Sequence, residues 1–207
     1  MLSTLNQVDT TLFYWINGHY CALLDWVLWF FSQSWSWILF LLYPILFSIN
    51  KMGWKKSWII LLGVVLCFLL SDRISVMCFK DVVQRPRPCH VLENVRMFQT
   101  SCGGKYGFIS SHAANCFSLT LFLSLMCSNI NSWYTEKKES VQRYKTKWIT
   151  IGLVLWSLLI CYSRPYLGKH YPGDVFCGAI VGCGIGALVF YIVFKIFTSI
   201  VKNQSLK

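Results

Sequence analysis

Long stretches without a single charged residue most restrict how this chain of 207 residues can fold. They cover residues 26–50, 57–71, 113–135, 148–163 and 175–194. A helix needs about 20 mostly apolar residues to cross the hydrocarbon core of a membrane, and most of the runs meet or approach that length. Charged residues make up only 13% of the chain, against about 25% in soluble domains. The pattern therefore predicts an integral membrane protein.

The two shorter runs need residues from beyond their own ends to span a membrane. The run at 57–71 is long enough only if its helix continues through Asp72 and Arg73. Lys147 can extend the run at 148–163, because its long side chain can snorkel to the membrane surface. We therefore expect an all-α bundle of about five spanning helices, at about 33–50, 56–80, 111–131, 148–163 and 173–197. Because the sequence has no repeat or low-complexity tract, residues 1–207 are expected to form a single domain.

The segment ahead of the first run has a different pattern. Over residues 4–17, apolar side chains recur at helical spacing, at Leu5, Val8, Leu12, Phe13 and Ile16. This spacing predicts an amphipathic helix at the membrane surface. The apolar segment 23–31 is short and predicts either a second interfacial helix or a partial insertion.

The net charge of +11 has two readings. In a soluble protein it would suggest nucleic acid, but in a membrane protein the positive-inside rule explains it without a nucleic-acid partner. Basic clusters at 51–56, 137–147 and 195–207 all fall on one side if each run crosses the membrane once. That side is then cytoplasmic. The external side still carries Lys80, Arg85, Arg87, Arg96, Lys105, Arg164 and Lys169, and binding an anionic substrate would explain them.

Two of these cations lie at the end of the second predicted span. Six residues separate Lys80 from Arg87, and the prolines at 86 and 88 predict that Arg87 turns inward from a loop. A lysine supplies a point charge and an arginine a bidentate fork, so the pair suits a phosphate. Taken alone, the pair is also compatible with interfacial snorkelling.

A second polar segment directly precedes the third span. Ser110 or Ser111 is a natural N-cap, and the free N–H groups of a helix start attract anions. His112 would lie in the first turn, facing whatever binds there. Taken alone, this segment is also compatible with an ordinary cap beside an interfacial histidine.

The third segment joins the fourth and fifth spans. His170 and Asp174 are four residues apart around the predicted start of the last helix, where Pro172 suits the first turn. A carboxylate that accepts a hydrogen bond from one ring nitrogen leaves the other free to attack. Arg164 follows the fourth span and can reach the same face. Half of a metal site is the alternative, but no further carboxylate or histidine cluster completes one, so no metal or other cofactor is expected.

The chain has ten cysteines, and two of them bracket the external loop. Because an external loop can be oxidising, Cys89 and Cys102 are candidates for a disulfide. Zinc is the alternative, since His90 neighbours Cys89, but no fourth ligand lies at a typical spacing.

Together, Lys80 with Arg87-Pro88, Ser110-Ser111-His112, and Ser163-Arg164 with His170 and Asp174 resemble the type 2 phosphatidic acid phosphatase and vanadium haloperoxidase superfamily. The motifs match its order and spacing and cover residues 80–174. The compact scaffold resembles the bacterial membrane lipid phosphatases of that superfamily. One departure is Ile109, where the family usually has proline.

The resemblance implies a role for each residue. His170 resembles the family's nucleophile, which forms a phosphohistidine, and Asp174 would orient it. His112 resembles the general acid. Lys80, Arg87, Arg164, Ser110 and the backbone near Ser111 would bind the phosphoryl oxygens.

These roles imply a metal-independent phosphatase that hydrolyses a lipid phosphate or diphosphate. Its site would face the periplasm or exterior from a bacterial inner membrane, and its substrate would be of the undecaprenyl diphosphate or lipid A type. The alternatives are a phosphatidylglycerophosphate or phosphatidate phosphatase, a lipid phosphotransferase that uses the same phosphohistidine, and a non-catalytic lipid-binding protein or flippase. The intact His112, His170 and Asp174 argue against the last of these.

Overall fold

The computed structural model describes residues 2–134 and 139–205. Within these ranges the regular structure is helical, and Pro86 and Tyr106 form an isolated β-bridge. The elements are α1 (Leu2–Gly18), α2 (Ala22–Ser32), the 3₁₀ turn η1 (Ser34–Ser36), α3 (Trp37–Met52), α4 (Trp54–Ile74), the π-helical turn η2 (Ser75–Lys80), α5 (Asp81–Val83), α6 (Pro88–Val91), α7 (Ser111–Tyr134), α8 (Glu139–Tyr166) and α9 (Pro172–Ser205). The all-α prediction is confirmed.

Five helices in the described residues are long and apolar enough to cross a membrane: Ser34–Met52, Lys56–Val83, Ser111–Ile130, Thr146–Tyr166 and Pro172–Ser199. The second continues through Asp72 and Arg73 as predicted, but it does not end at Lys80. The π-helical turn leads into α5, so the helix ends at Val83. The fourth is also longer than predicted, because the charged residues at its ends do not interrupt its backbone hydrogen bonds.

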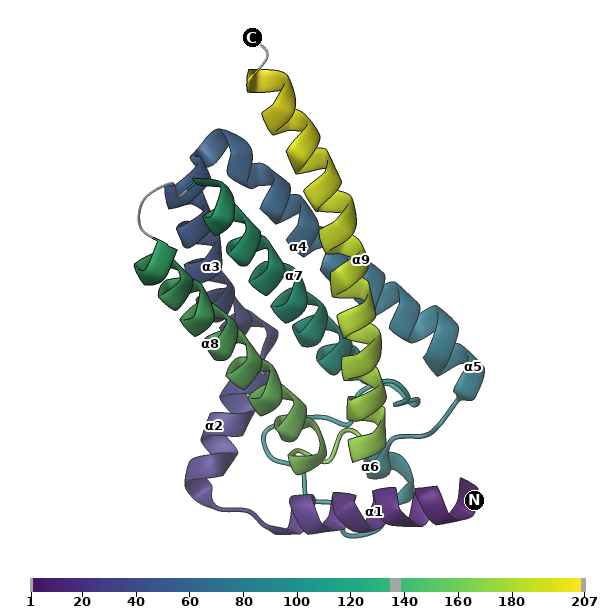
Figure 1. Ribbon diagram of the computed structural model, residues 1–207. Coiled ribbons are helices and arrows are strands. Elements are labelled where there is room, and N and C mark those ends of the chain that lie inside the picture. Colours follow the sequence, from purple (N-terminus) through teal and green to yellow (C-terminus); the bar gives the residue numbers. More distant parts are fainter. Residues whose placement is uncertain (1, 135–138, 206–207) are drawn as a thin grey trace.

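Helix α7 lies at the centre of the bundle, where it packs against α3, α4, α8 and α9 (Figure 1). Its contact with α9 is close because three glycines of α9 face the α7 backbone. An ideal Cβ at Gly178 would lie 2.6 Å from the Ser110 carbonyl oxygen, and one at Gly186 would lie 2.5 Å from that of Ser118. One at Gly182 would overlap the Ala114 carbonyl oxygen. Small residues therefore let the two backbones approach, as is common between membrane helices.

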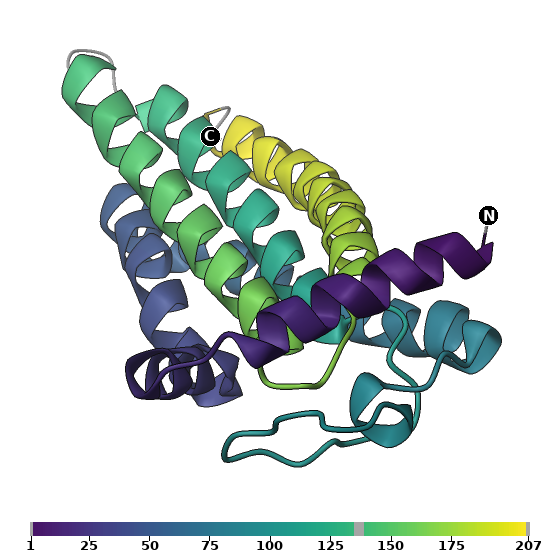
Figure 2. The ribbon, with the colours of Figure 1, turned by 90° about the horizontal axis from the view of Figure 1, so that it is seen from below.

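The two ends of the bundle differ. The α3–α4 connection and the C-terminal end of α9 lie at one end (Figure 1). At the other end lie the loop after α5, the α8–α9 connection and α1, which crosses the ends of α8 and α9 (Figure 2). This is the division that the charge pattern predicted. Lys137, Lys138 and Lys207, which belong to that pattern, lie outside the described residues.

The N-terminal segment forms a helix with two faces. Phe13 of α1 is fully buried, whereas Leu5 is 60% and Trp15 is 60% exposed. An apolar face turned outward at the end of a membrane bundle suits the membrane surface. Residues 22–32 form the separate helix α2, which packs against α8.

The α7–α9 contact can be tested with two glycines two positions apart on α9. Gly182→Ala should destabilise the protein by about 1–3 kcal/mol, because the added methyl group would overlap the Ala114 carbonyl. Gly184 has no atom within 4 Å of an added Cβ, so Gly184→Ala should be neutral or stabilise by up to about 1 kcal/mol. Thermal unfolding in detergent, followed by tryptophan fluorescence, measures both. Equal effects at the two positions would contradict the packing described.

Candidate functional site

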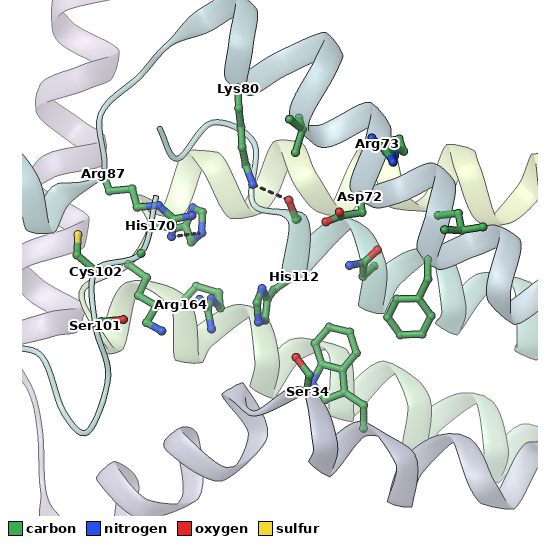
Figure 3. A pocket seen from close by; sticks show the side chains of 18 residues that line it. Ser34, Asp72, Arg73, Lys80, Arg87, Ser101, Cys102, His112, Arg164 and His170 are labelled. Atoms are coloured by element: carbon green, nitrogen blue, oxygen red, sulfur yellow. Dashed lines mark hydrogen bonds between the residues drawn. The ribbon is translucent and has the colours of Figure 1, made fainter. Parts of the chain in front are cut away.

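The three polar segments singled out in the sequence meet at the α1 end of the bundle. They line a cavity of about 760 Å³, whose wall includes Lys80, Arg87, Ser111, His112, Arg164 and His170 (Figure 3). These residues come from the π-helical turn η2, the loop after α5, the start of α7, the end of α8 and the α8–α9 connection. Asp174 and Ser110 lie behind this wall, and both are fully buried.

Lys80 occupies the last position of the π-helical turn that extends α4. Its Nζ donates a hydrogen bond of 2.7 Å to the Ser111 hydroxyl at the start of α7. π-helical turns are uncommon and occur often at functional sites. Lys80 therefore lies within the helix, rather than at its end, and points toward α7.

Arg87 reaches the cavity from a loop, as its flanking prolines predicted. The helix ends before Gln84, which has a left-handed φ of 52°. The Arg87 N–H then donates to the Lys105 carbonyl at 3.1 Å, and the Gly107 N–H donates to the Arg85 carbonyl at 2.8 Å. These bonds hold the two arms of the loop together and bring Nη1 of Arg87 to 3.2 Å from Nε2 of His170.

His170 presents its two ring nitrogens to different groups. Nε2 faces Arg87 at the cavity, and Nδ1 lies 3.6 Å from Oδ2 of Asp174. That distance exceeds a hydrogen bond. The Asp174 carboxylate accepts hydrogen bonds from Arg85 at Oδ1 (2.7 Å) and from the Tyr171 N–H at Oδ2 (3.1 Å). Burial, Arg87 and Arg164 hold the pKa of His170 well below its usual range. The imidazole is therefore neutral at pH 7, and its Nε2 is available as a nucleophile.

The start of α7 brings His112 to the opposite side of the cavity. The helix begins at Ser111, and the Ser110 hydroxyl accepts a long hydrogen bond of 3.5 Å from the Ala113 N–H. The N-cap prediction thus applies to Ser110. His112 packs edge-on against Trp37 of α3, with ring centroids 5.5 Å apart.

Arg164 lies in the last turn of α8 and is only 2% exposed. Its Nη1 donates to the Ser32 hydroxyl of α2 at 2.5 Å. The Nε atoms of Arg164 and Arg87 are buried and have no hydrogen-bond partner. Buried donors normally have a hydrogen-bond partner, so each of these Nε–H groups can still donate to an acceptor that enters the cavity.

Two further cations, Lys169 and Arg85, belong to the site, although the motifs assign neither of them an individual role. Lys169 lines the cavity beside His170, and Arg85 contacts Asp174 from behind. Both are among the external basic residues that an anionic substrate would explain. Lys169 directly precedes His170 and Arg85 lies two residues before Arg87, but spacing alone does not predict the direction of either side chain.

Cys89 and Cys102 are joined by a disulfide between α6 and the following loop. Cys102 lines the cavity, so the disulfide ties a wall of the site to the segment that begins with Arg87. Within residues 2–134 and 139–205, no group of three or more His, Cys, Asp or Glu side chains could hold a metal ion.

Comparisons with known proteins agree on one family. Residues 56–198 match the model of the PAP2 superfamily. A lipid A 4'-phosphatase of Porphyromonas gingivalis is 32% identical over 92% of this chain and 73% of its own length. One of Bacteroides thetaiotaomicron is 27% identical over 99% of this chain and 85% of its own. A transmembrane PAP2-type phosphatidylglycerolphosphate phosphatase of Bacillus subtilis shares the fold, with a TM-score of 0.68 at 16% identity over 95% of this chain and 88% of its own.

Lys169 should make anion binding in the cavity depend on pH. Burial, Arg164 and Arg87 lower the pKa of Lys169 to about 8, so this side chain is charged below that pH and neutral above it. Between about pH 7 and about pH 9, binding of tungstate, a dianion of constant charge in this range, should weaken about 3- to 10-fold. Lys169→Met should bind less tightly at about pH 7 and lose most of this dependence. Isothermal titration calorimetry measures both, and an unchanged dependence in the variant would contradict the assignment.

Proposed function

Since this chain belongs to the PAP2 superfamily, we propose that it is a membrane phosphatase that removes phosphate from a lipid through a phosphohistidine. The observation that carries the proposal is the environment of His170. Its Nε2 faces a cavity whose buried arginines, Arg87 and Arg164, each have an unsatisfied Nε. A phosphoryl group in the cavity would accept hydrogen bonds from these two Nε–H groups. It would also place its phosphorus next to Nε2 of His170.

In the first step, Nε2 of His170 attacks the phosphorus and the bond to the lipid oxygen breaks. Lys80, Arg87 and Arg164 stabilise the charge on the phosphoryl oxygens, together with the Ser111 end of α7. Lys80 is pre-positioned by its bond to the Ser111 hydroxyl. These cations supply the charge neutralisation, so the proposed reaction uses no metal.

His112 completes both steps as acid and then as base. It donates a proton to the departing lipid oxygen, which leaves as a hydroxyl. It then takes a proton from water as that water attacks the phosphohistidine, and the phosphorus–nitrogen bond breaks to release inorganic phosphate. Its position at the start of α7, beside Arg164 in the lining of the same cavity as His170, supports this division of labour (Figure 3). Ser110, which the resemblance assigns to the phosphate, is fully buried behind the cavity wall, and we assign its hydroxyl the role of N-cap at the start of α7 instead.

We propose a lipid A type phosphate as the substrate. The support is that two relatives that align over most of this chain are lipid A 4'-phosphatases. The cavity agrees with an amphipathic substrate, because Phe68 and Leu69 of α4 and Val76 of η2 add apolar side chains to its lining. The phosphate would lie among the cations and the lipid body along α4.

The proposed location is a bacterial inner membrane, with the site facing the periplasm. The support is the charge division between the ends of the bundle, together with the disulfide in the loop at the cavity. The whole of residues 1–207 would serve as one catalytic domain, with residues 80–174 holding the motifs.

A phosphate-release assay tests the nucleophile and the substrate. Purified protein in detergent with EDTA should release phosphate from lipid A faster than from undecaprenyl diphosphate, phosphatidylglycerophosphate or phosphatidate. His170→Ala should abolish release, because no other group replaces its Nε2. His90→Ala is the matched control, since His90 is exposed in the same region and does not line the cavity, and it should keep full activity. Release by His170→Ala, or release that requires added metal, would contradict the mechanism.

A change of leaving group separates the acid from the nucleophile. His112→Ala should lower kcat/KM toward lipid A by about 100- to 10,000-fold, the usual contribution of general acid catalysis. Toward p-nitrophenyl phosphate the loss in kcat/KM should be much smaller, because nitrophenolate leaves without a proton. The comparison, by steady-state kinetics, uses kcat/KM because this ratio excludes hydrolysis of the phosphohistidine, which is common to both substrates and also needs His112. Equal losses of kcat/KM on both substrates would contradict the role of His112 as the acid.

A further inference from the structure

An ion-pair chain behind the cavity connects the N-terminal helix to Asp174. Nη1 of Arg85 lies 2.7 Å from Oδ1 of Asp174 and 2.7 Å from Oδ2 of Asp9 in α1. The guanidinium also stacks on the Tyr171 ring, 3.9 Å from its centroid. One cation from the loop thus joins two carboxylates from opposite ends of the chain.

Asp9 makes a second contact that fixes this arrangement. Its Oδ1 accepts a hydrogen bond of 2.7 Å from the Gly173 N–H in the first turn of α9. A negative side chain is stabilising at a helix start, where backbone N–H groups are unpaired. Asp9 therefore holds both Arg85 and the helix start that carries Asp174.

Because Asp174 is buried, the stability of its charged form depends on these ion pairs. The carboxylate is 0% exposed, and a buried carboxylate is costly unless it is paired and hydrogen-bonded. The His170 ring nitrogen is 3.6 Å away, so the direct charged partner of Asp174 at hydrogen-bond distance is Arg85. Arg85 takes Oδ1, which leaves Oδ2 on the side of His170.

We propose that Arg85 and Asp9 are positioning residues that keep the Asp174 carboxylate charged and turned toward His170. The inference rests on the nucleophilic role proposed for His170. Neither residue lines the cavity. Without the pair, Asp174 would lose the contact that fixes its rotamer, and the His170 ring would lose its orienting group.

The structure offers a matched control in a second ion pair of the same kind. Arg96, from the same loop, pairs with Asp25 of α2 at 2.6 Å and 2.8 Å. This pair also ties an N-terminal helix to the loop, but the contacts of Asp25 run to Arg96 and Tyr166 rather than to His170 or Asp174. Asp25→Asn thus measures the effect of losing an ion pair between an N-terminal helix and the loop when the contacts of Asp174 are left unchanged.

The test compares Arg85→Gln, Arg85→Lys, Asp9→Asn and Asp25→Asn in the full chain. Arg85→Gln should lower kcat for lipid A about 10- to 100-fold with KM nearly unchanged, because orientation is lost while the phosphate clamp remains. Asp9→Asn should lower kcat less, Arg85→Lys should recover part of it, and the double variant Asp9→Asn/Arg85→Gln should be no worse than Arg85→Gln alone. Asp25→Asn should lower thermal stability without changing the kcat of the folded protein.

A second readout keeps this inference separate from the choice of substrate. Diethyl pyrocarbonate modifies nucleophilic imidazoles, and mass spectrometry gives the rate at His170 relative to exposed His90. That relative rate should fall in Arg85→Gln and Asp9→Asn and stay at the wild-type value in Asp25→Asn. If wild-type protein releases no phosphate from any lipid, the proposed function fails and this rate still decides the inference. Wild-type kcat and wild-type His170 reactivity in Arg85→Gln, or equal kcat losses in Asp25→Asn, would overturn it.

Discussion

The close contact between α7 and α9 is the constraint on which the site depends. Glycines at 178, 182 and 186 let the α9 backbone approach that of α7, and at the end of this contact the Ser110 N–H donates to the Asp174 carbonyl at 3.0 Å. The first turn of α7 carries His112, and the segment entering α9 carries His170. A wider separation of these helices would move the two histidines apart.

Around this contact the protein collects positive charge that its own residues only partly satisfy. Lys80 bonds to Ser111, and Arg164 bonds to Ser32, but neither partner is an acid. Asp174, a buried carboxylate behind the cavity wall, is engaged by Arg85 on the far side. Asp72 also lines the cavity, but Lys80, Arg87, Arg164 and Lys169 give the wall an excess of positive charge that suits an anion.

The sequence was sufficient to locate the five spans and to identify the motif residues that line the cavity. Uncharged runs locate membrane helices reliably, because hydrocarbon requires every backbone polar group to be bonded within its segment. Motif order then identified Lys80, Arg87, His112 and Arg164. The helix ends were less predictable, because the π-helical turn at Ser75–Lys80 leaves no pattern of charge or hydropathy. The partners of Asp174 were not predictable either. Arg85 reaches that carboxylate from the loop after α5, and Asp9 reaches Arg85 from α1, which docks across the ends of α8 and α9. Both contacts depend on tertiary packing that spacing does not encode.

The Asp9–Gly173 hydrogen bond also has a consequence for biogenesis. Its two residues are separated by 164 positions, so the ribosome has made nearly all of the spans before the second partner emerges. The contacts of Asp9 and Arg85 with α9 can therefore form only after that helix has been synthesised. A chain that ends before residue 172 would keep Lys80, Arg87 and His112 but would lack both Asp174 and the Gly173 N–H that Asp9 binds.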